Sequence, residues 1–198
     1  MEIFKRSYNF EIRVNEDKEN KKYILTGRPI VYNSKTDLGY FYEIIEVGAL
    51  DKANLKDVRF LVNHDTNRIP LARATEGNKE STMRFNVDKN GMEIWVELDV
   101  ENNSEARALY FAVLRGDITG MSFMFTIDVE EWENLESEHP TRHIKSIGQV
   151  FEVSAVTFPA YEASEISARD KKSLDDAVNK ARTNDLDLLK LKAKYIYN

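Results

Sequence analysis

The sequence predicts a mainly β protein with peripheral helices, an α+β fold, that ends in a helical tail. Alternation of apolar and polar residues dominates the first 160 positions, which is typical of strands with one buried face. Helical spacing of apolar residues is confined to one stretch after residue 103 and to the C-terminal residues. From Asp170 onward glycine, proline, phenylalanine and tryptophan are absent. We therefore expect a β-rich body over residues 1–169 and a helical tail over residues 170–198.

Strand candidates follow one another along the body, and each combines alternating or continuous apolar residues with flanking turn residues. They cover residues 10–14, 23–32, 83–98, 121–127 and 150–158. The third candidate is a hairpin, because its centre is Asn90-Gly91, a pair that tolerates the positive φ angles of tight turns. The last two candidates are rich in apolar residues, which predicts two fully or mostly buried strands.

Helical signals are few. A helix is expected over residues 104–115, because Asn103 or Ser104 can cap its start and Gly116 can end it. In the tail, a weak capping box over residues 173–176 predicts a second helix start. The apolar stripe that follows slips in phase near residue 184, so we expect an interruption there.

Composition excludes several chemistries. The chain has 198 residues, a net charge of −6, no cysteine and three histidines. Without cysteine there is no thiol nucleophile, no disulfide and no cysteine-ligated metal. An acidic chain lacks the basic face typical of nucleic-acid-binding proteins, and no apolar stretch has the length of a signal peptide or a membrane span. We expect an intracellular soluble protein without nucleic-acid or membrane partners.

His64 is the most distinctive of the three histidines. It follows the apolar run Phe60-Leu61-Val62 and stands between Asn63 and Asp65. One interpretation is structural, a half-buried histidine that is hydrogen-bonded to Asp65. The other is functional, a general base, because neutral imidazole accepts a proton from a hydroxyl near pH 7. The motif alone leaves both interpretations open.

Ser122 is a small hydroxyl residue within an aromatic, methionine-rich strand candidate. Gly120 just before it permits close approach of another backbone or a substrate. On a strand, Ser122, Met124 and Thr126 share one face. The structural interpretation is a buried serine bonded to a neighbouring carbonyl group. The functional interpretation is a nucleophile, which requires an activating base within hydrogen-bonding distance.

Glu152 lies inside the apolar run of residues 150–158. If the strand has a solvated face, this carboxylate is simply exposed. If the strand is buried, the carboxylate needs a cation or several hydrogen-bond donors, because an unpaired buried charge is costly. A histidine imidazolium is a natural partner.

His139 and His143 are four residues apart, a spacing that places two metal ligands on one face of a helix. Pro140 between them argues against such a helix, and the glutamate-rich residues 130–138 are typical of a solvated hairpin or loop. Neither a phosphate-binding loop nor a dinucleotide-binding motif is present. We expect no metal and no cofactor.

Four segments of the chain combine these features in a fixed order. They are Glu46-Val47-Gly48-Ala49-Leu50, Val62-Asn63-His64-Asp65, Gly120-Met121-Ser122-Phe123-Met124-Phe125, and Glu152 to Tyr161. In this order and spacing they resemble the prohead (capsid maturation) serine proteases of tailed bacteriophages, the HK97-like family. The resemblance covers roughly the first 168 residues. The chain departs from the usual pattern at Ala72 and Met124, where glycine is common, and Met124 would narrow the substrate cleft.

The resemblance implies a β-barrel protease domain over residues 1–169, similar to herpesvirus assemblin. It implies a serine endopeptidase in which Ser122 attacks the scissile carbonyl and His64 is the general base. Glu152 would orient the imidazole, with His139 and His143 as alternatives because related proteases place a second histidine there. Oxyanion donors would be backbone amides.

The resemblance also implies a biological setting. Its substrates would be the major capsid protein and scaffolding segments, and the protease itself, inside the assembling procapsid in the host bacterial cytoplasm. The helical tail would be a docking helix, a segment removed by self-cleavage, or a solvated helix on the body. Two other functions remain open: a non-enzymatic virion assembly protein that binds capsid or scaffold, and a generic intracellular serine hydrolase.

Overall fold

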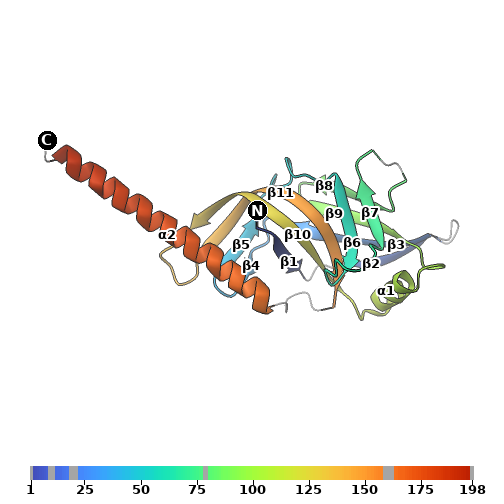
Figure 1. The fold of residues 1–198 in the computed structure, drawn as a ribbon. Coiled ribbons are helices and arrows are strands. Elements are labelled where there is room, and N and C mark those ends of the chain that lie inside the picture. Colours follow the sequence, from blue (N-terminus) through green and yellow to red (C-terminus); the bar gives the residue numbers. More distant parts are fainter. Residues whose placement is uncertain (1, 9–11, 18–21, 78–79, 158–162, 197–198) are drawn as a thin grey trace.

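A computed structural model describes residues 2–8, 12–17, 22–77, 80–157 and 163–196. Two β-sheets form the body, with a short helix beside it and a long helix whose C-terminal half projects away from it (Figure 1). The predicted α+β class with a mainly β body is therefore confirmed. Neither described helix combines the length and apolar character that crossing a membrane would need.

The larger sheet has seven strands, and the 16-residue strand β11 is its centre. The strands are β1 (Phe4–Tyr8), β4 (Thr36–Asp37), β5 (Tyr42–Ile45), β6 (Asp57–Val62), β7 (Ala72–Thr75), β10 (Gly120–Glu133) and β11 (Thr141–Val156). β10 lies between β1 and β11 and is antiparallel to both. On its other side, β11 pairs in parallel with β5 through residues 141–144 and with β6 through residues 152–155. β11 therefore holds two separate segments of the chain next to β10.

The smaller sheet consists of β2 (Arg13–Asp17), β3 (Lys22–Val31), β9 (Gly91–Leu98) and β8 (Met83–Asp88), in that spatial order. β8 and β9 form the predicted hairpin. Gly91 has a φ of 126°, and a Cβ placed there would lie 2.0 Å from the Ile30 carbonyl oxygen of β3. Only glycine fits this contact, because any side chain would clash with backbone that cannot move away.

The two helices differ in how closely they match the expectation. Helix α1 (Ser104–Arg115) begins and ends as predicted, since the Asn103 side chain accepts hydrogen bonds from two amides of the first turn and Gly116 is left-handed. Helix α2 (Ala163–Ile196) starts before the capping box at residues 173–176 and has no break near residue 184. Both of those predictions are wrong. Around residue 184 the described side chains of α2 are exposed, so a slipped apolar stripe has no packing consequence.

The core lies mainly between the two sheets. Met121, Phe123 and Phe125 of β10 and Ile94 and Val96 of β9 are all fully or almost fully buried in one cluster. The predicted β-barrel, however, is not found. Among the described strands, β1, β4 and β7 remain edges of one sheet and β2 and β8 edges of the other, so neither sheet closes.

The two buried strand candidates are found, but each is longer than predicted. β10 continues to Glu133 with exposed residues, and β11 begins at Thr141, so the glutamate-rich stretch forms the solvated end of the β10–β11 hairpin. Antiparallel pairing between the two strands extends the ladder beyond the apolar residues. Phe10 and Phe158, at the ends of two strand candidates, lie outside the described residues.

Candidate active site

Ser122 lies near the start of β10, in the middle of three neighbouring strands. In the cross-strand register it stands opposite Ser7 of β1 on one side and Ser154 of β11 on the other. Side chains at paired positions point to the same face of a sheet, so three hydroxyl groups lie in a row. The side chains of this row are buried or half-buried, and Ser122 has no exposed surface.

His64 reaches this row through an unusual turn at the end of β6. Asn63 and His64 are both left-handed, with φ of 50° and 56°, a conformation that costs energy in residues other than glycine but is tolerated best by asparagine, aspartate and histidine. Backbone bonds hold the turn against β11: the Asn63 amide donates to the Ala155 carbonyl at 2.9 Å and the His64 amide to the Ser154 hydroxyl at 3.1 Å. The Thr157 amide donates to the Asn63 side chain.

The turn places the imidazole between Ser122 and Glu152. His64 Nε2 lies 2.5 Å from Ser122 Oγ, and His64 Nδ1 lies 2.5 Å from Glu152 Oε1. The side chains of His64 and Glu152 are 0% and 2% exposed. With the ring proton on Nδ1, that N–H donates a hydrogen bond to the carboxylate, and Nε2 accepts a hydrogen bond from the serine hydroxyl. In this geometry the imidazole can activate the hydroxyl, and the carboxylate orients the imidazole.

A fourth side chain, Ser154, ties the acid and the histidine together. Its hydroxyl donates to Glu152 Oε2 at 2.5 Å and accepts the hydrogen bond from the His64 amide. Each oxygen of Glu152 therefore has a donor, which removes the cost of burying an unpaired carboxylate. Ser154 was not among the predicted site residues, although its position two residues after Glu152 puts both on one strand face.

Ser122 has two further partners on β1. Ser7 Oγ donates to Ser122 Oγ at 2.9 Å, and the Arg6 carbonyl oxygen lies 2.8 Å from it. A hydroxyl has one proton to donate, so the Arg6 carbonyl and His64 Nε2 compete for it. The bond to a carbonyl, which the structural interpretation predicted, and the contact with histidine are therefore both present.

The side chain of the same Arg6 belongs to a buried cluster of charged groups. Glu43 of β5 accepts from Arg6 at 2.5 Å and from Arg142 of β11 at 2.5 Å, and Asp170 of α2 accepts from Arg6 at 2.9 Å. Burial raises the pKa of Glu43, but the two guanidinium groups outweigh it and lower this pKa to about 2. Burial raises the pKa of Asp170, and the Glu43 charge adds to this. The cluster joins β1, β5, β11 and α2.

The remaining candidates lie elsewhere. His139 Nε2 contacts Asp37 at 3.0 Å, and His143 Nδ1 contacts Glu46 at 2.6 Å. Asp65 forms an ion pair within its own turn rather than with His64. Glu152, and neither of these two histidines, is the group on His64 Nδ1. Within the described ranges no cluster of three or more potential ligands could hold a metal ion.

Comparison with known proteins adds an independent observation. The family model described as caudovirus prohead serine protease matches residues 8–178, a range that contains Ser122, His64 and Glu152. No curated protein and no solved structure matches the chain, so the likeness to assemblin stays a prediction. Since the family model covers most of the sequence, the chain belongs to the caudovirus prohead serine protease family.

Proposed function

We propose that the chain is a serine endopeptidase of phage capsid maturation, with Ser122 as nucleophile, His64 as general base and Glu152 as the orienting acid. The observation that carries the proposal is the unbroken line of contacts from Ser122 Oγ through the imidazole to Glu152, at 2.5 Å each. Membership of a serine protease family agrees with this chemistry. The line joins residues from three strands or strand ends that are 30 to 88 positions apart, so local chain geometry does not account for it.

In the proposed acylation step, Ser122 Oγ attacks the carbonyl carbon of the scissile bond while its proton passes to His64 Nε2. The imidazolium then gives this proton to the leaving amine as the C–N bond breaks. Glu152 keeps the other ring proton on Nδ1 and stabilises the imidazolium charge. In deacylation, a water molecule attacks the acyl carbon while its proton passes to His64 Nε2. The bond between this carbon and Ser122 Oγ then breaks, and the imidazolium returns the proton to Oγ, which releases the product acid and restores the serine hydroxyl. We propose backbone amides as the oxyanion donors.

The proposed substrates follow from the family. They are the major capsid protein and scaffolding segments of the procapsid in which the protease is enclosed, and the protease itself. The proposed setting is the assembling procapsid in the host cytoplasm, with self-association as a further proposal. The chain would need no cofactor for this reaction, because nucleophile, base and acid are all side chains of its own.

Co-expression with the capsid protein of the same phage tests the proposal. We expect Ser122→Ala and His64→Ala each to abolish cleavage, measured by intact-mass spectrometry of the capsid protein. Ser146→Ala and His139→Ala are matched controls, since both positions are partly buried and neither contacts the line. Full processing by Ser122→Ala would contradict the proposal.

Capsid processing and a separate assay of ester hydrolysis distinguish the other two functions. An unchanged capsid mass with the wild-type chain would favour a non-enzymatic assembly protein. Turnover of small esters without any proteolysis would favour a generic serine hydrolase.

A further inference from the structure

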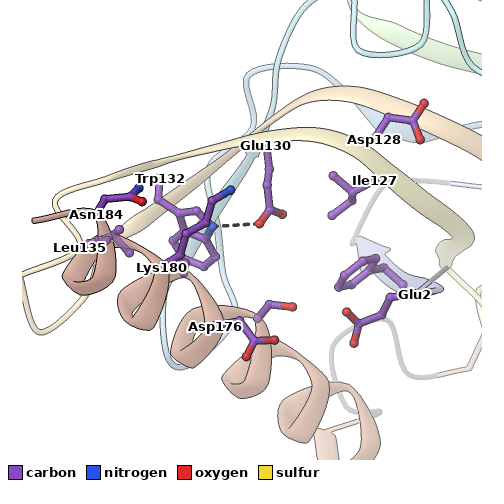
Figure 2. A pocket seen from close by; sticks show the side chains of 13 residues that line it. Glu2, Ile127, Asp128, Glu130, Trp132, Leu135, Asp176, Lys180 and Asn184 are labelled. Carbon is purple, nitrogen blue, oxygen red and sulfur yellow. Dashed lines mark hydrogen bonds between the residues drawn. The ribbon is translucent and has the colours of Figure 1, made fainter. Parts of the chain in front are cut away.

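A groove of about 730 Å³ lies between α2 and β10, at the start of β1 (Figure 2). In Figure 2, side chains from the helix and from the strand converge on the same space. β10 and the turn after it contribute Ile127, Asp128, Glu130, Trp132 and Leu135, and the start of the chain contributes Glu2 and Phe4. The helix contributes Ser173, Asp176, Ala177, Lys180, Ala181 and Asn184.

The groove stays open because α2 presents small side chains to it. Ser173, Ala177 and Ala181 recur every four residues, so they lie along one face of the helix. Larger residues at these positions would fill the space between helix and sheet. The helix therefore forms one wall of the groove and leaves its floor on β10 accessible.

The floor borders an edge of β10 that pairs with none of the described strands. β1 begins at Phe4 and pairs with residues 121–125 of β10. From Thr126 to Glu133, β10 pairs with β11 on one side, and none of the described strands lies on the other. An unpaired strand edge offers a row of backbone donors and acceptors to an extended peptide.

The groove is strongly acidic. Four carboxylates line it, Glu2, Asp128, Glu130 and Asp176, against the single ammonium group of Lys180. Glu130 accepts from the indole of Trp132 and lies 3.5 Å from Arg142. In the described part of the chain no ion pair involves Asp128 or Asp176. The charge that would complement this surface is positive.

We propose that the groove binds an extended, cationic peptide segment of a partner protein by strand addition to the free edge of β10. Lysine or arginine side chains of the segment face Asp128, Glu130 and Asp176. Apolar side chains between them pack on Phe4 and Ile127. Since extended residues alternate between the two faces, the acidic wall selects segments in which cationic and apolar residues alternate.

This groove is separate from the proposed catalytic residues. Phe4 lines the groove and Ser7 contacts Ser122, and residues three apart on a strand point to opposite faces of the sheet. The inference is therefore a binding site in addition to the proposed protease site. Its test uses the full-length Ser122→Ala protein, so the probe is not cleaved and the outcome does not depend on whether the chain is a protease.

The probe is an acetylated and amidated hexapeptide of alternating lysine and valine. The chain has two tryptophans, and Trp95→Phe in the Ser122→Ala background leaves Trp132 as the reporter. We expect saturable quenching or shift of the Trp132 fluorescence that weakens as salt is raised. Asp176→Lys is expected to weaken binding by at least about tenfold.

Asp175→Lys is the matched control, because it changes the net charge equally one residue away and Asp175 does not line the groove. It should leave the affinity within about twofold, as expected for a charge outside the contact surface. A probe with alternate backbone amides methylated should also bind weakly, since it cannot pair with the strand edge. Equal weakening by the two aspartate variants, equal binding of a glutamate–valine probe, or no saturation would each overturn the proposal.

Discussion

Glu152 is the residue whose role depends most on geometry, because each of its oxygens has one partner, His64 or Ser154. Glu152→Gln keeps the shape but removes the charge that stabilises imidazolium and offers an amide where the ring proton needs an acceptor. We expect kcat to fall by roughly 10²- to 10⁴-fold with the fold retained. Single-turnover cleavage and circular dichroism measure the two effects.

Glu46→Gln is the control for this change, because Glu46 also contacts a histidine, His143, but lies away from Ser122. Unchanged cleavage by Glu152→Gln would transfer the third role to a histidine or remove it.

Ser154 is expected to position the acid without touching substrate. Ser154→Ala removes the donor to Glu152 Oε2 and the acceptor for the His64 amide. We expect kcat to fall by about 10- to 100-fold, since hydrogen bonds to charged groups contribute about 1.5–3 kcal/mol. KM should stay unchanged, and Ser154→Thr should restore part of kcat. Ser146→Ala, on the same strand, is the control. A loss of stability in Ser154→Ala with wild-type kcat would show a structural role alone.

At this scale the sequence predicted some residues of the site and not others. Ser122, His64 and Glu152 could be selected because each is a polar residue in or beside an apolar strand. Ser7 could not, since it lies 115 positions from Ser122 and only the register of β1 on β10 brings them together. Register between distant strands depends on the whole sheet rather than on a local pattern.

At the scale of elements, the ionic cluster around Glu43 joins three strands and α2. Glu43→Gln leaves the buried Arg6 and Arg142 without their shared carboxylate, and removing one partner of such a group costs about 3–5 kcal/mol. We expect the free energy of unfolding, measured in urea at pH 7, to fall by this amount. Asp57→Asn is the control. Asp57 pairs with the exposed Arg73, and loss of this surface ion pair should cost about 1 kcal/mol or less.

The cluster also predicts a pH dependence. The pKa of Glu43 is lowered from 4.5 to about 2, so its contribution to stability is present above pH 4.5 and is lost as the pH falls toward 2. The pKa of Asp170 is raised, so this group lowers the stability of the fold as the pH rises above the ordinary pKa of an aspartate. The difference between wild type and Glu43→Gln contains the contribution of Glu43 together with its effect on Asp170, and it should shrink between pH 5 and 2 as Glu43 is protonated. A constant difference would contradict it.

The elements themselves were predictable where local chemistry decides them. The Asn90-Gly91 turn and the Asn103 and Gly116 caps set the β8–β9 hairpin and helix α1. The full length of β10 and β11 was not predictable, because their solvated ends are held by pairing with each other rather than by burial. Tertiary pairing overrides weak local preference in such strands.

At the scale of the molecule, truncations within α2 test where the folded body ends. Asp170 of α2 is 1% exposed, whereas Leu186 and Leu188 are at least half exposed. A chain that ends at Asn184 should therefore keep its Tm within about 2 °C, because it loses little buried surface. A chain that ends at Arg169, the boundary predicted from composition, should melt at least about 4 °C lower, since Arg6 and Arg142 lose cover and a partner. Equal melting of both chains would support the boundary at 169.

The whole architecture was predictable only in part. Alternating strands and few helices predicted the α+β class, but the expected barrel came from the family resemblance and not from the residues. In the larger sheet, β5 and β6 both pair with β11, along different stretches of it. No local sequence pattern indicates that two distant segments pair with the same strand.

The absence of exposed surface on Ser122 has a kinetic consequence. If Ser122 is the nucleophile, a reagent such as a fluorophosphonate reacts only with molecules that have opened, and an open fraction of about 1% slows labelling about a hundredfold. At high reagent concentration the labelling rate should reach a plateau set by opening and rise steeply with temperature. A rate proportional to reagent concentration throughout would mean that the site is always accessible. A plateau would mean that the opening rate, rather than the chemical step, sets how soon the first peptide bond is cleaved.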